Sequence, residues 1–422
     1  MSSYKSFFKD KKVLVVGLGS NFEAISDISF LVKAGAIVSV IDMRSEVRIE
    51  SAVKKIQAIG MISCEFGTMA RSHVEGKDLV LKALNVPYDV PCVEEAIYRN
   101  IPVEISSTLF LKLAPSIILI GVLGMCGKST TASLIEKILA PKFNKKDEQQ
   151  FFYIDQKSYS PLTVLKKIRK GDIVLTSILD EQKDSYIQSR ISPHVAVVTN
   201  PTDLKLLEFQ TYNNFVVAND VTVDAIKDIK ISIKSKILRT TPALIPHTWR
   251  IEQPSHIKEN MALALRVAEL FKIEFDEMQD MFETFKPLKG RLELCKNNIY
   301  NDATSVRPYA TYTALKTIGG EKDTILILGG GHVNDDLYDL FKIIPQYVHV
   351  LILIPGSGTI KLHQANIKSL YASSIEEALS LAKKHADKHH KILFSPGFSP
   401  LTSVKDRYDQ FVKALKSLNL HK

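Results

Sequence analysis

Three runs of apolar, mostly β-branched residues each lead into a turn that contains glycine. The runs cover residues 13–16, 117–120 and 324–328, and the turns that follow them include Gly17, Gly124 and Gly329. Continuous apolar runs of this length, bounded by glycine and alternating with helical segments, are typical of strands buried in parallel sheets. The pattern therefore predicts the α/β fold class, with three α/β units that begin near residues 1, 117 and 288.

Helical periodicity fills the spaces between these runs. Apolar residues recur at helical spacing after Lys128, and this helix is expected to stop at Pro141. Residues 110–115 are predicted as a linker, and proline and glycine mark a second boundary at residues 287–290. We therefore predict a Rossmann-like N-terminal domain at 1–112, a central P-loop ATPase-type domain with a parallel sheet at 113–287, and a Rossmann-like C-terminal domain at 288–422.

Composition narrows the class of protein. The chain has 422 residues, of which 45% are hydrophobic and 24% charged, as in ordinary soluble globular proteins. Its net charge of +9 is spread along the chain with no aromatic-interleaved basic patch, so no nucleic-acid partner is predicted; a surface that favours small anions is the alternative. The four cysteines form no CxxC pair, which argues against a zinc site or a disulfide framework. Without a signal peptide or a long apolar run, the protein is expected to be cytoplasmic, with no membrane partner.

The strongest chemical signal is a glycine–lysine turn between an apolar run and a helix, which we call the phosphate loop. It comprises Gly124, Met125, Cys126, Gly127, Lys128, Ser129 and Thr130. Glycines let backbone N–H groups converge on phosphate oxygens, and a helix N-terminus adds a positive dipole end. Lys128 would contact the β- and γ-phosphates, and Ser129 or Thr130 could bind Mg²⁺. Val122 replaces the first glycine of the usual motif, so a plain glycine turn is the alternative.

A weaker nucleotide signal follows the first apolar run. Gly17 and Gly19 form the turn, and Asp42 lies at the end of the second predicted strand with Arg44 two residues on. This resembles a dinucleotide fingerprint, except that Phe22 replaces its third glycine. The alternative is a Rossmann-like turn without a ligand.

Further candidate residues belong to the last third of the chain and to the helix before it. Arg291 and Asp302 lie at the start of the third unit, although Arg291 could instead form a structural ion pair with Glu293. Residues 395–399 follow the last predicted strand, at the sheet end where α/β folds bind ligands, but an ordinary turn is equally compatible. Asn260 and His256, one helical turn apart, could face a base or simply cap their helix.

Taken in order, these motifs resemble the Mur ligase family over nearly the whole chain, from about Lys11 to about Leu418. The resemblance implies an enzyme, expected to be a monomer, that uses ATP and Mg²⁺ to phosphorylate a substrate carboxylate. The amino group of an amino acid then attacks the acyl phosphate. The implied substrates are UDP-N-acetylmuramoyl-L-alanine and D-glutamate, in the synthesis of peptidoglycan precursors.

The resemblance also implies roles for single residues. Gly17, Gly19, Asp42 and Arg44 would hold UDP; the phosphate loop and Asn260 would bind ATP; Arg291 and Asp302 would complete the ATP site; and Ser399 would lie in the D-glutamate pocket. Several family positions differ: Thr176 stands for a metal-binding glutamate, with Asp180 and Glu181 nearby as alternative substitutes; Asn219 stands for a carbamylated lysine; and Thr304 stands for a further lysine. A catalytically impaired nucleotide-binding or UDP-sugar-binding protein, or a ligase of changed amino-acid specificity, are therefore the alternatives.

Overall fold

The computed structural model describes residues 3–19, 24–144, 148–154, 160–201, 204–228, 233–296, 298–331, 336–364 and 368–420. Its contacts divide the chain into two compact units. The first unit comprises Met1–Pro246 and Glu259–Met278, and the second comprises His247–Lys258 and Gln279–Lys422. Phe22, where the sequence lacks the third glycine of a dinucleotide fingerprint, lies outside the described residues. The two predicted boundaries between the three domains remain predictions.

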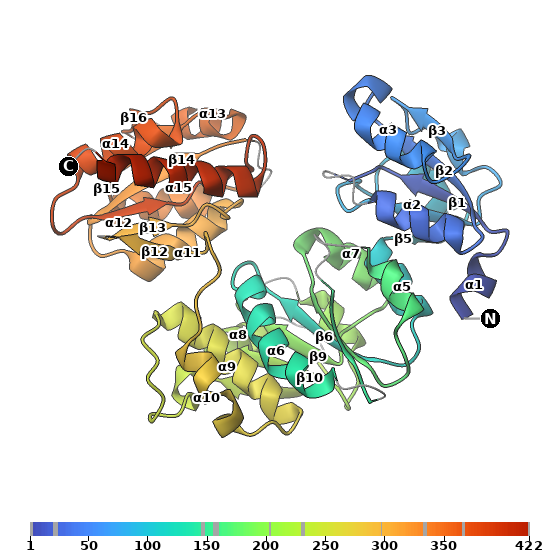
Figure 1. The fold of residues 1–422 in the computed structure, drawn as a ribbon, viewed down its shortest axis with the longest axis horizontal. Helices are drawn as coiled ribbons and strands as arrows, with labels where there is room; N and C mark the ends of the chain where they lie inside the picture. Colours follow the sequence, from blue (N-terminus) through green and yellow to red (C-terminus); the bar gives the residue numbers. More distant parts are fainter. Residues whose placement is uncertain are drawn as a thin grey trace. The chain divides into compact units, whose positions relative to one another are not determined.

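The first sheet is parallel, with the strand order β3-β2-β1-β4-β5. Its strands are β1 (Lys12–Val16), β2 (Ile37–Asp42), β3 (Ser63–Phe66), β4 (Leu79–Lys82) and β5 (Val103–Glu104). Its helices are α1 (Ser3–Phe8), α2 (Ala24–Lys33), α3 (Glu50–Gln57), α4 (Pro91–Tyr98) and α5 (Ser106–Leu113). Figure 1 draws most of this region in blue.

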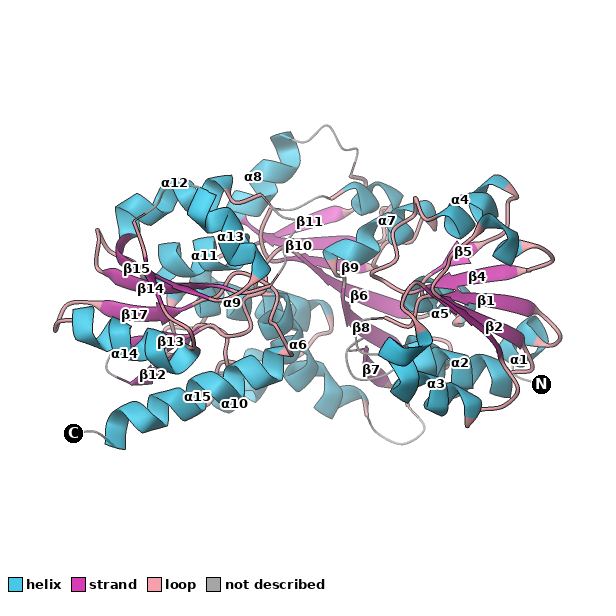
Figure 2. Ribbon diagram, turned by 90° about the horizontal axis from the view of Figure 1, so that it is seen from above, coloured by secondary structure: helices cyan, strands magenta, loops and turns pink. Residues whose placement is uncertain are grey.

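Both faces of the first sheet are covered, which explains the unbroken apolar run in β1. Val13 and Val15 pack with α2 and α3, whereas Leu14 and Val16 belong to a separate cluster with α4. Successive side chains of a strand point to opposite faces, so a strand between two helical layers must be apolar at every position. Figure 2 shows α4 on one side of the sheet and α2 and α3 on the other.

The second sheet is also parallel, in the order β11-β10-β9-β6-β8-β7. It is built from β6 (Ile118–Leu123), β7 (Phe151–Ile154), β8 (Ile173–Ser177), β9 (Val195–Val198), β10 (Phe215–Asn219) and β11 (Lys236–Thr240). The helices of this part are α6 (Lys128–Phe143), α7 (Asp180–Gln188), α8 (Asp220–Asp228) and α9 (Ser255–Leu270). Strand β6 lies between β9 and β8 near the middle, and the phosphate loop follows directly from its end.

The second unit contains a mixed sheet in the order β12-β13-β17-β14-β15-β16. Its strands are β12 (Glu293–Lys296), β13 (Ile299–Asn301), β14 (Thr324–Gly329), β15 (Val348–Ile354), β16 (Leu370–Tyr371) and β17 (Lys391–Phe394). Its helices are α10 (Gln279–Glu283), α11 (Pro308–Ile318), α12 (Tyr338–Tyr347), α13 (Ser357–Gln364), α14 (Ile375–His385) and α15 (Val404–Leu420). Only the β12–β13 pair is antiparallel among the described strands. The predicted α/β fold class is confirmed.

Two local predictions are wrong. Residues 110–115 are no linker, because α5 extends to Leu113 and Phe110 is fully buried in the first core. Helix α6 does not stop at Pro141 but continues to Phe143. The Phe143 ring packs edge-on against Phe271 of the first unit, with ring centroids 5.8 Å apart. A proline within a helix removes one backbone hydrogen bond, and this apolar contact offsets that loss near the end of α6.

Among the described residues, no helix combines the length and the apolarity that crossing a membrane requires.

Candidate nucleotide-binding site

The phosphate loop is a glycine turn whose backbone only glycine adopts easily. Gly124 and Gly127 have φ angles of +131° and +79°. A Cβ atom on Gly124 would lie 2.1 Å from Thr199 Oγ1, and one on Gly127 would lie 2.8 Å from Asn260 Oδ1. Glycine is therefore required at both positions for two reasons: the positive φ of the backbone, and the close approach of a neighbouring side chain.

Two residues at the end of β9 hold the loop from outside. Thr199 Oγ1 donates to the carbonyl oxygens of Leu123 and Cys126, at 3.0 and 2.5 Å. Asn200 Oδ1 accepts from the Met125 N–H at 2.7 Å, and Asn200 Nδ2 donates to the Cys126 carbonyl oxygen at 3.0 Å. The loop is thus fixed by side chains of the neighbouring strand rather than by its own packing.

Lys128, Ser129 and Thr130 form the first turn of α6. The Lys128 ammonium donates back to the Gly124 carbonyl oxygen and contacts that of Met125 at 3.5 Å. Asn260, from α9, accepts from Thr131 Oγ1 at 3.2 Å, which places its side chain against the start of the same helix. The structure therefore brings Asn260 together with the phosphate loop; that these residues bind a nucleotide stays a prediction.

This arrangement has the chemistry of an anion site. The first N–H groups of an α-helix have no acceptor within the helix, and α6 is long enough, at 16 residues, to carry a full dipole. A lysine ammonium stands at the same end. Backbone donors, dipole and ammonium all favour phosphate oxygens.

For Mg²⁺, the side chains that could contribute are hydroxyl groups. The described residues contain no group of three or more His, Cys, Asp or Glu side chains that could hold a metal. Ser129 and Thr130 begin α6, and Mg²⁺ at nucleotide sites takes much of its shell from phosphate oxygens and water. The donor set suits one ion held mainly through a nucleotide.

Two positions at which the resemblance implies metal-site residues have local structural roles here. Thr176 Oγ1 donates to the Ile154 carbonyl oxygen of the adjacent strand at 3.2 Å. Asn219 Oδ1 accepts from the Thr222 N–H at 2.9 Å and so caps α8. Neither side chain supplies a carboxylate or an ammonium.

The four predicted UDP-binding residues also meet in space, at the carboxyl end of the first sheet. The buried Asp42 carboxylate accepts from the Leu18 N–H at 2.8 Å and from Arg44 Nε and Nη2 at 2.8 and 2.7 Å. Arg44 Nη2 also donates to the Gly19 carbonyl oxygen at 3.1 Å. Burial opposes ionisation of Asp42, but the hydrogen bonds from Arg44 and Leu18 hold its pKa below the ordinary value.

In the second unit, Asp302 lies at the end of β13 and is buried. Its Oδ2 accepts from Ser395 Oγ at 2.7 Å, and its Oδ1 accepts from the Leu292 N–H at 3.1 Å. Burial raises the pKa of Asp302 to about 6, although the charges of Arg291 and Arg407 and these hydrogen bonds act in the opposite direction. The Glu293 carboxylate, the alternative partner suggested for Arg291, accepts from the Gly290 N–H at 2.8 Å.

Ser399 and its neighbours differ in what they contact. Ser399 accepts from the Gly331 N–H through its backbone carbonyl oxygen at 2.7 Å. The side chain that reaches Asp302 is that of Ser395, four residues earlier. Arg407, also buried, donates to the carbonyl oxygens of Ala303, Ser305 and Phe398 and joins the loops at this sheet edge.

The sequence alone assigns no site role to Thr199, Asn200 or Arg407, and Ser395 enters only within the candidate segment 395–399. The signal that could have found them is their place after a buried strand, at the carboxyl edge of a parallel sheet. His256, near the start of α9, is largely buried with Nδ1 unpartnered among the described residues, and burial lowers its pKa to about 4.

No protein-family model matches the chain. It is 22% identical over 477 aligned residues to the UDP-N-acetylmuramoylalanine–D-glutamate ligase of Acetivibrio thermocellus, covering 99% of both chains. It is 25% identical over 440 residues to the enzyme of the same name from Listeria innocua, covering 92% of each.

Two solved structures from Thermotoga maritima share its fold. One is a UDP-N-acetylmuramate-alanine ligase, with a TM-score of 0.53, 15% identity and coverage of 96% of this chain and 99% of that one. The other is a MurF ligase in complex with ADP, with a TM-score of 0.52, 14% identity and coverage of 98% and 97%.

Proposed function

Since this chain belongs to the Mur ligase family, we propose that it is an ATP-dependent ligase of peptidoglycan precursor synthesis that adds D-glutamate to UDP-N-acetylmuramoyl-L-alanine. The relatives that carry the D-glutamate name are similar along nearly their whole length. Their names support the choice of substrates.

The observation that carries the proposal is the supported phosphate loop. Its two glycines, its lysine and the start of α6 converge on one point, and Thr199, Asn200 and Asn260 hold that geometry in place. A plain glycine turn would need neither the lysine nor three polar side chains from other elements around it.

The reaction would proceed in two steps. A carboxylate oxygen of the UDP-sugar substrate attacks the γ-phosphorus of ATP, and ADP leaves. The amino nitrogen of D-glutamate then attacks the acyl carbon, loses a proton and expels phosphate, which leaves an amide. Lys128 and the N–H groups of the loop would neutralise the charge of the transferring phosphoryl group, the term that contributes most in such reactions.

The remaining ligands would be distributed over the sheets. Mg²⁺ would contact the hydroxyl of Ser129 or Thr130 and the phosphates. Gly17, Gly19, Asp42 and Arg44 would hold the UDP group at the first sheet. Arg291, Asp302 and Ser399 of the second unit are proposed to serve ATP and D-glutamate.

A second candidate is a nucleotide-binding protein of the same family with impaired catalysis. It is favoured by the local roles of two residues that stand where the family has metal-site residues: Thr176 bonds to the adjacent strand, and Asn219 caps α8. Losing such charges removes stabilisation worth several kcal/mol at a phosphoryl-transfer site.

Phosphate release distinguishes the two. The full chain is mixed with ATP, Mg²⁺, UDP-N-acetylmuramoyl-L-alanine and D-glutamate, and each component is omitted in turn. The proposed ligase releases phosphate only in the complete mixture. ATP binding without phosphate release, with D-glutamate or with any of a panel of amino acids, would favour the impaired protein. Phosphate release with another amino acid would show a ligase of different amino-acid specificity.

A further inference from the structure

The loop that follows β4, residues 83–88, forms one wall of the first glycine turn. Lys82 at the end of β4 pairs with Val16 of β1, and the Ala83 N–H donates to the Val16 carbonyl oxygen at 2.9 Å. The loop then returns, so that a Cβ atom on Gly17 would lie 2.6 Å from Val86 Cγ2. The position of Val86 therefore sets how much space the turn leaves for a ligand.

A buried lysine fixes this loop. Lys82 is 4% exposed, and its ammonium donates to the Val86 carbonyl oxygen at 2.7 Å. The ammonium also lies 4.5 Å from the centre of the Tyr88 ring, a cation–π contact. Burial lowers the pKa of Lys82 to about 8, partly opposed by the charge of Asp184. Burying a lysine ammonium costs free energy, so packing alone does not explain a lysine at this position.

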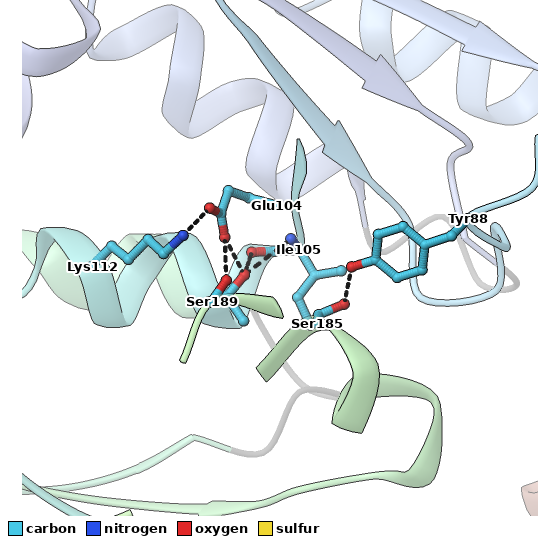
Figure 3. A network of polar contacts seen from close by, with 7 residues as sticks. Tyr88, Glu104, Ile105, Lys112, Ser185 and Ser189 are labelled. Atoms are coloured by element: carbon cyan, nitrogen blue, oxygen red, sulfur yellow. Dashed lines mark hydrogen bonds and ion pairs between the residues drawn. The ribbon is translucent and has the colours of Figure 1, made fainter. Parts of the chain in front are cut away.

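Tyr88 in turn reaches the second sheet's helices. Its hydroxyl forms a 2.7 Å hydrogen bond with Ser185 Oγ of α7 (Figure 3). Helix α7 starts three residues after β8, whose last residue, Ser177, pairs with Val122 of the strand that leads into the phosphate loop. One helix thus connects the edge that carries the phosphate loop to the loop beside Gly17.

A neighbouring contact on the same helix provides a natural comparison. Ser189, one turn after Ser185, donates to Glu104 Oε2 at 3.2 Å, and Glu104 is also bonded to Thr108 and Lys112 (Figure 3). Residues four apart lie on one face of a helix, so both serines face the first sheet's elements. Only Ser185, however, is linked to the loop at Gly17.

We propose that Lys82, Tyr88 and Ser185 are positioning residues for the nucleotide-sugar ligand, because together they hold residues 83–88 against the Gly17 turn and anchor them to α7. The inference rests on the proposed function, since it concerns the same UDP-binding turn. These three residues lie outside the Gly17 turn and set its shape through residues 83–88.

The test compares Tyr88→Phe and Ser185→Ala with the matched control Ser189→Ala in the full-length protein. Dissociation constants for UDP-N-acetylmuramoyl-L-alanine and for ATP are measured by titration calorimetry, together with the Tm of each variant. Tyr88→Phe keeps the aromatic ring over Lys82 and removes only the hydroxyl. We expect a roughly three- to tenfold weaker affinity for the UDP-sugar in both test variants, the effect of one hydrogen bond. ATP affinity should not change.

The control separates positioning from stability. Ser189→Ala should lower Tm about as much as Ser185→Ala and leave UDP-sugar affinity unchanged. Amide hydrogen exchange of residues 83–88 should become faster in Tyr88→Phe and stay at the wild-type rate in Ser189→Ala.

The outcomes distinguish this inference from the function on which it rests. Wild-type binding of the UDP-sugar with unchanged affinity in both test variants would overturn the positioning role alone. Equal weakening by Ser189→Ala would also overturn it. A wild-type chain that binds ATP but no UDP-sugar would overturn the proposed function and this inference with it.

Discussion

Lys128 closes its own loop, because its ammonium donates to the carbonyl oxygen of Gly124 and lies within 3.5 Å of that of Met125. These are weak, exchangeable partners compared with a triphosphate, whose oxygens carry full charges. The side chain is thus held at the mouth of the phosphate loop in a position from which it can transfer its hydrogen bonds to a nucleotide.

Replacing this lysine should affect one ligand and not the other. Lys128→Ala is expected to weaken ATP binding roughly 10- to 100-fold, the effect of losing a charged hydrogen bond. Affinity for the UDP-sugar should remain, because Gly17, Asp42 and Arg44 belong to a different sheet. Titration calorimetry measures both, with Lys137→Ala, an exposed position of the same helix, as the control. Equal loss of both affinities in a folded variant would contradict the assignment of the two sites.

Asp302 gives a pH dependence whose sign follows from its pKa. Its pKa is raised from 3.8 to about 6 by burial, so the folded protein holds this proton more tightly than the unfolded chain does. Between these two values the folded state binds more protons, and stability therefore falls as pH rises. Above about pH 6 the loss is complete.

The isosteric Asp302→Asn variant lacks this titration. We expect the wild-type free energy of unfolding, relative to that of Asp302→Asn, to fall by roughly 2–2.5 kcal/mol between pH 4 and pH 7. Urea unfolding at constant ionic strength measures the difference. A difference that stays flat or increases over this range would show that the pKa of Asp302 is not raised in the folded protein.

At the scale of elements, the phosphate loop depends on β9, which is 75 residues away in sequence. The backbone of Gly124 and the side chain of Thr199 approach so closely that no side chain fits between them. The strand order places β9 beside β6, and this adjacency, not the loop sequence, determines which residues support the loop.

Gly124→Ala tests this support, with Gly171→Ala as its match. Gly171 also has a positive φ, +90°, but nothing lies within 4 Å of its missing Cβ. Gly171→Ala should lose roughly 1–2 kcal/mol of stability through backbone strain alone, with ATP affinity unchanged. Gly124→Ala should lose more stability and also ATP affinity, because Thr199 must move. Similar losses in both variants, measured by urea unfolding and ATP titration, would contradict the close packing.

Elements were predictable where one residue pattern decides the structure. Residues 13–16 of β1 are apolar at every position because helices cover both faces of the first sheet, and glycine ends all three apolar runs, at Gly17, Gly121 and Gly329. By contrast, β16 has two exposed residues, so no pattern marks it. Residues 110–115 are predicted as a linker, yet α5 continues to Leu113 and Phe110 is buried, which depends on tertiary packing that no local pattern shows.

The candidate sites follow the same division. The phosphate loop and the pair of Asp42 and Arg44 are local in sequence and were predicted as groups. Ser395 reaches Asp302 across 93 residues, and Tyr88 reaches Ser185 across 97, through strand order and packing that no short motif encodes.

For the whole molecule, the order of motifs was more informative than any single motif. Each glycine turn alone is compatible with an ordinary α/β connection. Their succession along 422 residues resembles that of Mur ligases, and the similarity to named ligases extends over nearly the full length of the chain. The described contacts form two units, with the phosphate loop and the first glycine turn in one and Asp302 in the other.

Amide formation through an acyl phosphate can be tested by following one carboxylate oxygen of the UDP-sugar substrate into the released phosphate. UDP-N-acetylmuramoyl-L-alanine labelled with ¹⁸O in its carboxylate is incubated with the protein, ATP, Mg²⁺ and D-glutamate, and the released phosphate is analysed by mass spectrometry. We expect one ¹⁸O atom in each released phosphate, because the carboxylate oxygen that attacks ATP leaves with the phosphoryl group. Unlabelled phosphate would mean that water attacks ATP instead, and would contradict the acyl-phosphate mechanism.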